Sequence, residues 1–141
     1  MKWDEKMQLT ATTGQLSVVT DAKAPLGNGS AMTPKELVVV GLCGCTAMDV
    51  VALMRKHKQD VKSFVVEADV TTTETHPMVF SKAELNFKLE GNALDKAKIL
   101  EAVQLSQTKY CGVSAMLSKA FPIHYSVYVN GEQVGQGEAN F

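Results

Sequence analysis

Three cysteines are the residues of this chain best suited to redox or nucleophilic chemistry. Cys43 and Cys45 lie within the apolar stretch VVVGLCGCTAMDVVALM, residues 38–54, and Cys111 lies far downstream in TKYCGVSAML. A cysteine acts as a nucleophile or a metal ligand once its thiol loses the proton. The number of cysteines is odd, and the amino terminus shows no basic segment followed by an apolar one. These two features predict reduced thiols in a cytoplasmic protein rather than a disulfide framework.

The spacing of the first two cysteines predicts that they meet different surroundings. In a helix, positions two apart point in nearly opposite directions, at about 100° per residue. Cys43 shares its face with apolar residues such as Val50, so we expect it to act as a small buried hydrophobic residue. Cys45 shares its face with Gly41, which leaves space, and with Asp49, which needs a partner if it is buried. Two interpretations stay open for Cys45, a space-filling side chain or a reactive thiol.

Cys111 is expected at a break between two helices, next to Gly112. A thiol near the start of a helix, with Lys109 close in sequence, can have a lowered pKa. Two distant thiols fit an attacking and a resolving cysteine better than a metal site, because C-x-C plus one distant cysteine lacks a fourth ligand at a familiar spacing. His57 would lie about 18 Å along the helix from Cys45. The sequence therefore predicts neither a metal nor a cofactor.

A long central helix should position the first two cysteines. Residues 37–54 are almost entirely apolar, and TPKE supplies a capping box of Thr33 and Glu36 at the start of the helix. The basic residues 55–58 suit its end, where cations meet the negative end of the dipole. A membrane span is the less favourable interpretation, since Asp49 near its middle would be costly in lipid. We expect a buried helix.

The remaining patterns predict an α+β fold for a single domain, residues 1–141. Apolar and polar residues alternate as in half-buried strands, and later apolar residues recur at helical spacing. The strands are expected at 2–11, 15–20, 63–74, 81–90, 123–129 and after the turn at 130–133, and two helices at about 99–110 and 113–120. The net charge of −1 and the mixed charges give no reason to propose a nucleic-acid or membrane partner.

The segments TPKELVVVGLCGCTAMDVV and KYCGVSAML together resemble the OsmC/Ohr family, the osmotically induced and organic hydroperoxide resistance proteins. The resemblance covers nearly the whole chain. It implies an OsmC-like α+β fold with antiparallel sheets packed around a long central helix, in an intertwined homodimer with active sites at the interface. It places the two family cysteines on Cys45 and Cys111, leaving Cys43 as an extra. It also implies reduction of organic hydroperoxides by this pair, which a dithiol or a redoxin would restore.

The sequence departs from the established peroxidases near the reactive thiol. In those proteins an arginine from the amino-terminal region and a glutamate directly after the helix-start proline flank the thiol. Here Lys35 follows the proline, Glu36 comes one position later, and the only arginine is Arg55, at the far end of the helix. The resemblance is therefore closer to the less characterised OsmC-like branch of the family.

Two functions remain open on this basis. The first is a thiol-dependent peroxidase in oxidative or osmotic stress defence. The second is a non-catalytic, stress-linked protein that binds a small apolar ligand in the interface pocket and uses its cysteines as redox sensors. The residues expected to support the cysteine pair are Lys35, Glu36, Asp49 and Lys109.

Overall fold

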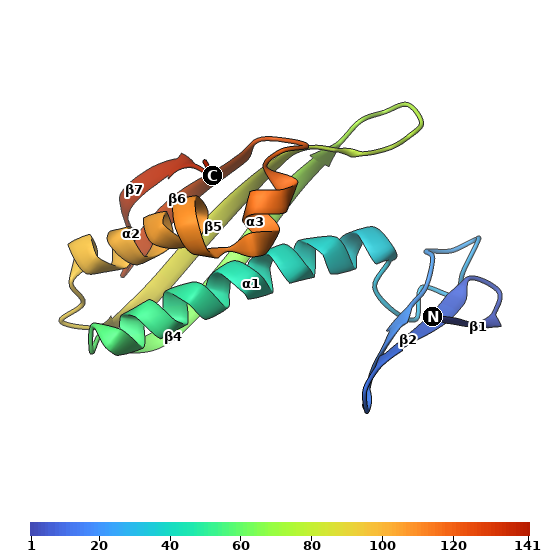
Figure 1. The fold of residues 1–141 in the computed structure, drawn as a ribbon, viewed down its shortest axis with the longest axis horizontal. Helices are drawn as coiled ribbons and strands as arrows, with labels where there is room; N and C mark the ends of the chain where they lie inside the picture. Colours follow the sequence, from blue (N-terminus) through green and yellow to red (C-terminus); the bar gives the residue numbers. More distant parts are fainter. The chain divides into compact units, whose positions relative to one another are not determined.

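The computed structural model describes all 141 residues, and the chain divides into two compact units, residues 1–40 and 41–141. The long helix α1 begins in the first unit and ends in the second (Figure 1). The elements in chain order are β1 Lys2–Glu5, β2 Gln8–Thr13, β3 Leu16–Thr20, α1 Pro34–Lys56, β4 Asp60–Thr72, β5 Phe80–Asn92, α2 Lys96–Leu105, η1 Ser106–Tyr110, α3 Gly112–Leu117, β6 Ile123–Val129 and β7 Glu132–Glu138.

The first unit contains a three-stranded antiparallel sheet in the order β1-β2-β3. Residues 2–11 were expected to form one strand, and that prediction is wrong. The chain reverses at Lys6, which has a positive φ of 45°, so that Trp3 pairs with Leu9 across the turn. The apolar and polar residues keep alternating through this tight turn, and the alternation alone therefore does not reveal it.

The capping box expected at the start of α1 is confirmed. The backbone N–H of Thr33 donates to Glu36 Oε2 at 2.7 Å, and the backbone N–H of Glu36 donates back to Thr33 Oγ1 at 3.3 Å. Lys23 Nζ lies 2.8 Å from Glu36 Oε1. The contact with Lys23 and the hydrogen bonds from Thr33 lower the pKa of Glu36 to about 2. Glu36 thus serves the start of the helix.

The second unit is built on a four-stranded sheet in the order β4-β5-β6-β7. The pairs β4–β5 and β6–β7 are antiparallel, whereas β5 and β6 are parallel, so the sheet is mixed where antiparallel sheets were expected. A parallel pair requires a long crossover connection. The segment α2–η1–α3 provides that crossover, and Figure 1 shows α2 and α3 on the same side of this sheet as α1.

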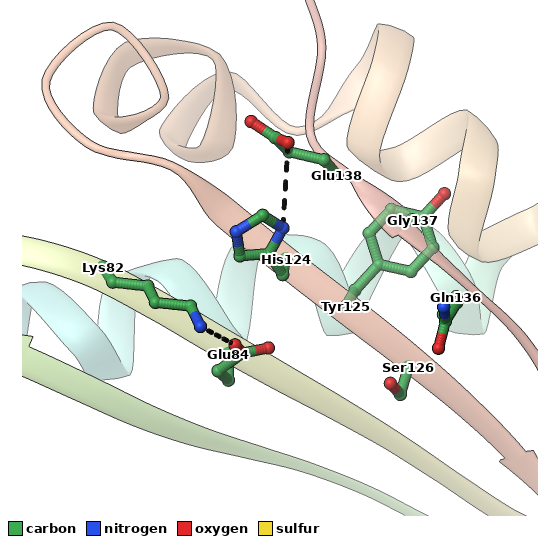
Figure 2. A pocket seen from close by; sticks show the side chains of 8 residues that line it. All are labelled: Lys82, Glu84, His124, Tyr125, Ser126, Gln136, Gly137 and Glu138. Atoms are coloured by element: carbon green, nitrogen blue, oxygen red, sulfur yellow. Dashed lines mark ion pairs between the residues drawn. The ribbon is translucent and has the colours of Figure 1, made fainter.

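The sheet presents an apolar face to the helices and a polar face on its other side. On the apolar face, the ring of Phe87 lies 6.5 Å from that of Phe64 and 6.4 Å from that of Tyr125, measured between centroids. Figure 2 shows residues of the polar face around a shallow pocket, where His124 Nδ1 lies 3.7 Å from Glu138 Oε2. His124 lies on the less buried face of β6.

Helix α1 is less buried than its sequence predicts. Its buried residues are Leu42, Thr46, Val50 and Met54, which follow one another at i+4 along a single face. Met48, on another face, is 75 % exposed. By length and composition alone α1 would also be able to cross a membrane, although the core helix of a soluble protein passes the same test. The sheet and the other helices cover one side of α1, and a large apolar surface remains on the other.

We expect Phe87→Ala to lower the free energy of unfolding by about 3–5 kcal/mol, because it removes a fully buried ring from the centre of the core. Lys88→Ala is the matched control on the opposite face of the same strand, where only an exposed ion pair with Glu67 is lost. Its effect should stay below about 1 kcal/mol. Urea unfolding at equal protein concentration measures both. Equal losses for the two variants would contradict the assignment of the two faces.

Candidate functional site

Cys45, Asp49 and Cys111 come together in the second unit. Cys45 and Asp49 are four residues apart on α1 and therefore point to the same side of the helix. Cys111 lies between η1 and α3. The two sulfur atoms and a carboxylate oxygen of Asp49 all lie within 4.8 Å of one another. The cysteine pair expected from the sequence is thus close in space, and Asp49 is its neighbour.

A widened helical turn positions Cys111. The π-helical segment η1 ends with the backbone N–H of Cys111 donating to the carbonyl of Ser106 at 3.0 Å. The backbone of Cys111 is then extended, with φ −70° and ψ 100°, and its side chain caps α3. Its Sγ accepts a hydrogen bond of 3.3 Å from the backbone N–H of Ser114. The predicted break at Cys111 is confirmed, and π-helical turns of this kind are frequent at functional sites.

A chain of hydrogen bonds, largely buried, joins α1 to η1 and ends at Asp49. Ser106 Oγ donates to Asp49 Oδ2 at 3.0 Å, and it also lies 2.8 Å from Thr46 Oγ1. A hydroxyl has a single proton. Since Ser106 gives its proton to the carboxylate, Thr46 must donate to Ser106, and Gln107 Nε2 in turn donates to Thr46 Oγ1 at 2.7 Å. Each donor in the chain therefore points toward Asp49.

The surroundings of Cys111 raise its pKa. The side chain is 0 % exposed. Burial is the main cause of the raised pKa, and the nearby Cys45 acts in the same direction, while the contacts with Ser114 oppose it in part. The expectation of a lowered pKa at this helix start is therefore wrong, because loss of hydration outweighs the short helix α3. Lys109 is exposed, with its Nζ 5.4 Å from the centroid of the Tyr110 ring.

The other candidate residues have different roles. Cys43 is half-buried and packs against the hydrophobic core, and burial raises the pKa of its thiol. Lys35 is exposed and belongs, like Glu36, to the first unit. Arg55 is exposed near the carboxyl end of α1. The structure therefore groups Asp49 with the cysteine pair, while Lys109 Nζ lies over the Tyr110 ring and Arg55 lies in the last turn of α1.

Sequence reasoning missed the residues that hold the site together, which are Thr46, Ser106, Gln107 and Ser114. All four are buried polar residues. Thr46 was visible as one of two polar interruptions in the apolar run, but its partners are about sixty positions away, at polar positions of the helix predicted for residues 99–110. Two thiols and a carboxylate suit either dithiol redox chemistry or the ligation of a soft metal ion.

Comparisons of the sequence and of the fold both find similar proteins. Residues 27–126 match the family of OsmC-like proteins. Protein YhfA of Escherichia coli K12 is 38 % identical over 99 residues, which are 70 % of this chain and 74 % of that protein. The crystal structure of an OsmC-like protein from Mycoplasma pneumoniae superposes with a TM-score of 0.77 at 14 % identity, covering 89 % of this chain and 91 % of the other.

A more distant structure carries a more specific description. The crystal structure of an organic hydroperoxide resistance protein from Legionella pneumophila superposes with a TM-score of 0.61 at 16 % identity. The alignment covers 86 % of this chain and 96 % of the other. At this identity the likeness establishes a common fold.

We expect a thiol reagent to modify Cys45 of the native protein fastest, Cys43 more slowly and Cys111 slowest. Cys43 packs against the core and Cys111 has no exposed surface, and burial raises the pKa of both thiols. Timed alkylation with iodoacetamide, followed by peptide mass spectrometry, measures the three rates. Denatured protein, in which the three rates should become similar, is the control. Equal native labelling of Cys43 and Cys45 would contradict the assignment.

Proposed function

Since the chain belongs to the OsmC-like protein family, we propose that it is a thiol-dependent peroxidase that reduces organic hydroperoxides with Cys45 and Cys111. The observation that carries the proposal is the approach of the two sulfur atoms, within 4.8 Å, from elements far apart in the sequence. The description of the Legionella pneumophila relative as an organic hydroperoxide resistance protein supports the substrate class.

The reaction uses the pair in two steps. The Cys45 thiolate attacks the outer oxygen of the hydroperoxide, the O–O bond breaks, and the alcohol leaves after taking a proton. Cys45 is then a sulfenic acid. The Cys111 sulfur attacks the sulfur of Cys45, forming a disulfide and releasing water. A small dithiol or a redoxin returns both cysteines to thiols by exchange.

The order of these roles follows from exposure and charge. Cys45 is half-buried and open to a small substrate, whereas Cys111 is fully buried and protected from direct attack by peroxide. Burial is the main cause of the raised pKa of Cys111, and the nearby Cys45 adds to it. Cys111 therefore stays protonated more readily than an exposed thiol, as suits the thiol that reacts second.

The charges around the pair favour a slow enzyme. Established relatives use an arginine to activate the thiol, but the single arginine of this chain, Arg55, lies near the end of α1. Asp49 brings a carboxylate, and no cation, next to the sulfur atoms. We assign Asp49 a structural role at the pair and keep Lys109 as a proposed supporting residue, whereas Lys35 and Glu36 belong to the first unit, where Glu36 caps the start of α1. Cytoplasmic location is part of the same proposal.

A non-catalytic function is the second candidate, and the exposed apolar side of α1 is the observation that favours it. In that case the exposed apolar side of α1 would help to hold a small apolar ligand, and the cysteines would only sense oxidants. The response of the cysteine pair to an added alkyl hydroperoxide distinguishes the two functions.

We expect one equivalent of an alkyl hydroperoxide, added without reductant, to convert the protein to a Cys45–Cys111 disulfide within one chain. In Cys111→Ser the same treatment should leave Cys45 as a sulfenic acid, which dimedone traps, because the resolving thiol is absent. Mass spectrometry of peptides identifies both products. Turnover in the presence of a dithiol should be measurable but slower than in arginine-bearing relatives.

Cys43→Ala is the matched control, because Cys43 lies two residues from Cys45 and packs toward the core. Its disulfide formation and turnover should equal those of the unchanged protein. If no disulfide forms and Cys111→Ser shows no oxidised Cys45, the peroxidase proposal is abandoned for the ligand-binding one.

We further propose a homodimer that covers the exposed apolar side of α1. Met48→Glu should convert the dimer to a monomer, because it places a charge on the exposed side of the helix where Met48 is 75 % exposed. Lys82→Glu, on the polar face of the sheet, is the control and should leave the dimer intact. Light scattering at micromolar concentration measures both. A monomeric unchanged protein would overturn this part of the proposal.

A further inference from the structure

We propose that the reduced site binds one soft divalent cation of the zinc class through Cys45 Sγ, Cys111 Sγ and a carboxylate oxygen of Asp49. The inference rests on the arrangement of these three groups and goes beyond peroxide chemistry. It also revises the expectation drawn from the sequence, which looked for cysteine and histidine ligands and treated Asp49 only as a helix neighbour of Cys45.

The three groups have the chemistry and the spacing of a zinc site. Thiolates and carboxylates bind zinc at about 2.3 Å and 2.0–2.2 Å respectively, so tetrahedral ligands lie roughly 3.5–4 Å from one another. The three atoms here already lie within 4.8 Å of one another. Cys45 and Asp49, one turn apart on α1, supply two ligands from one helix face, and Cys111 supplies the third from the facing segment.

Surrounding hydrogen bonds hold two of the ligands in place. Ser106 donates to Asp49 Oδ2 at 3.0 Å and leaves the other carboxylate oxygen available for a metal. The backbone N–H of Ser114 points at Cys111 Sγ from 3.3 Å and would stabilise the metal-bound thiolate. Partners of this kind orient ligands at metal sites, and their removal typically weakens metal binding by about 10–100-fold.

The arrangement leaves the fourth coordination position open. Cys111 is buried, but Cys45 and Asp49 are both half-buried, so the remaining position faces the accessible side of the pair. Water or an added small thiol would complete a tetrahedron there. Binding releases the two thiol protons and places both sulfur atoms on the ion. A bound ion would therefore block the alkylation of Cys45.

Zinc chloride titrated into the fully reduced protein, in competition with a chromogenic chelator, tests the site without any peroxide. We expect one ion per chain. Cys45→Ser and Cys111→Ser should each weaken binding by at least about 100-fold, and Asp49→Asn by at least about tenfold. Cys43→Ala should bind as the unchanged protein does. Cadmium chloride should give a thiolate-to-metal absorption band that falls by about half in each of the two serine variants.

Circular dichroism of each variant establishes that it is folded before the titration. Absence of one-to-one binding to the reduced protein would overturn the proposal. Binding by Asp49→Asn equal to that of the unchanged protein, or a loss in Cys43→Ala as large as in Cys45→Ser, would overturn it as well. Because the titration contains no oxidant, its outcome is independent of whether the cysteine pair reduces hydroperoxides.

Discussion

The hydrogen bond between Thr46 and Ser106 is the interaction on which the rest of the site depends. It joins α1 to η1 in a region where both side chains are 0 % exposed, and its oxygen atoms are 2.8 Å apart. A buried hydroxyl left without its partner costs roughly 1–3 kcal/mol, so the two elements are held at this separation. Cys45 directly precedes Thr46 in α1, so the position of Thr46 also sets that of Cys45. On the other side, η1 begins at Ser106 and ends just before Cys111.

Packing of the hydrophobic core brings α1 and η1 together at this point. The apolar face of the sheet carries Phe87 and Tyr125 toward the helices, and the buried face of α1 follows an i+4 pattern through Leu42, Thr46 and Val50. The parallel pairing of β5 and β6 requires a crossover, which carries η1 along the same side of the sheet. The packing of the crossover against α1 therefore brings together both the hydrogen-bonded residues from Gln107 to Asp49 and the cysteine pair.

Local features of the fold were predictable from the sequence. The capping box of Thr33 and Glu36, the strands β4 and β5 and the break at Cys111 each depend on residues close in sequence or on simple alternation. The separation of Cys43 from Cys45 followed from helix geometry. Features that depend on tertiary packing were not predictable. The burial that raises the pKa of Cys111, the partners of Thr46 and the exposed side of α1 are set by segments distant in sequence.

A redox titration shows whether Cys45 and Cys111 act as one unit. Protein carrying Cys43→Ala is equilibrated in buffers of reduced and oxidised dithiothreitol, and the free thiols at Cys45 and Cys111 are counted separately by alkylation and mass spectrometry. The account predicts that both thiols disappear together in a single two-electron transition, with the disulfide inside one chain. Separate transitions for the two thiols, or a Cys45 disulfide only between chains, would contradict it.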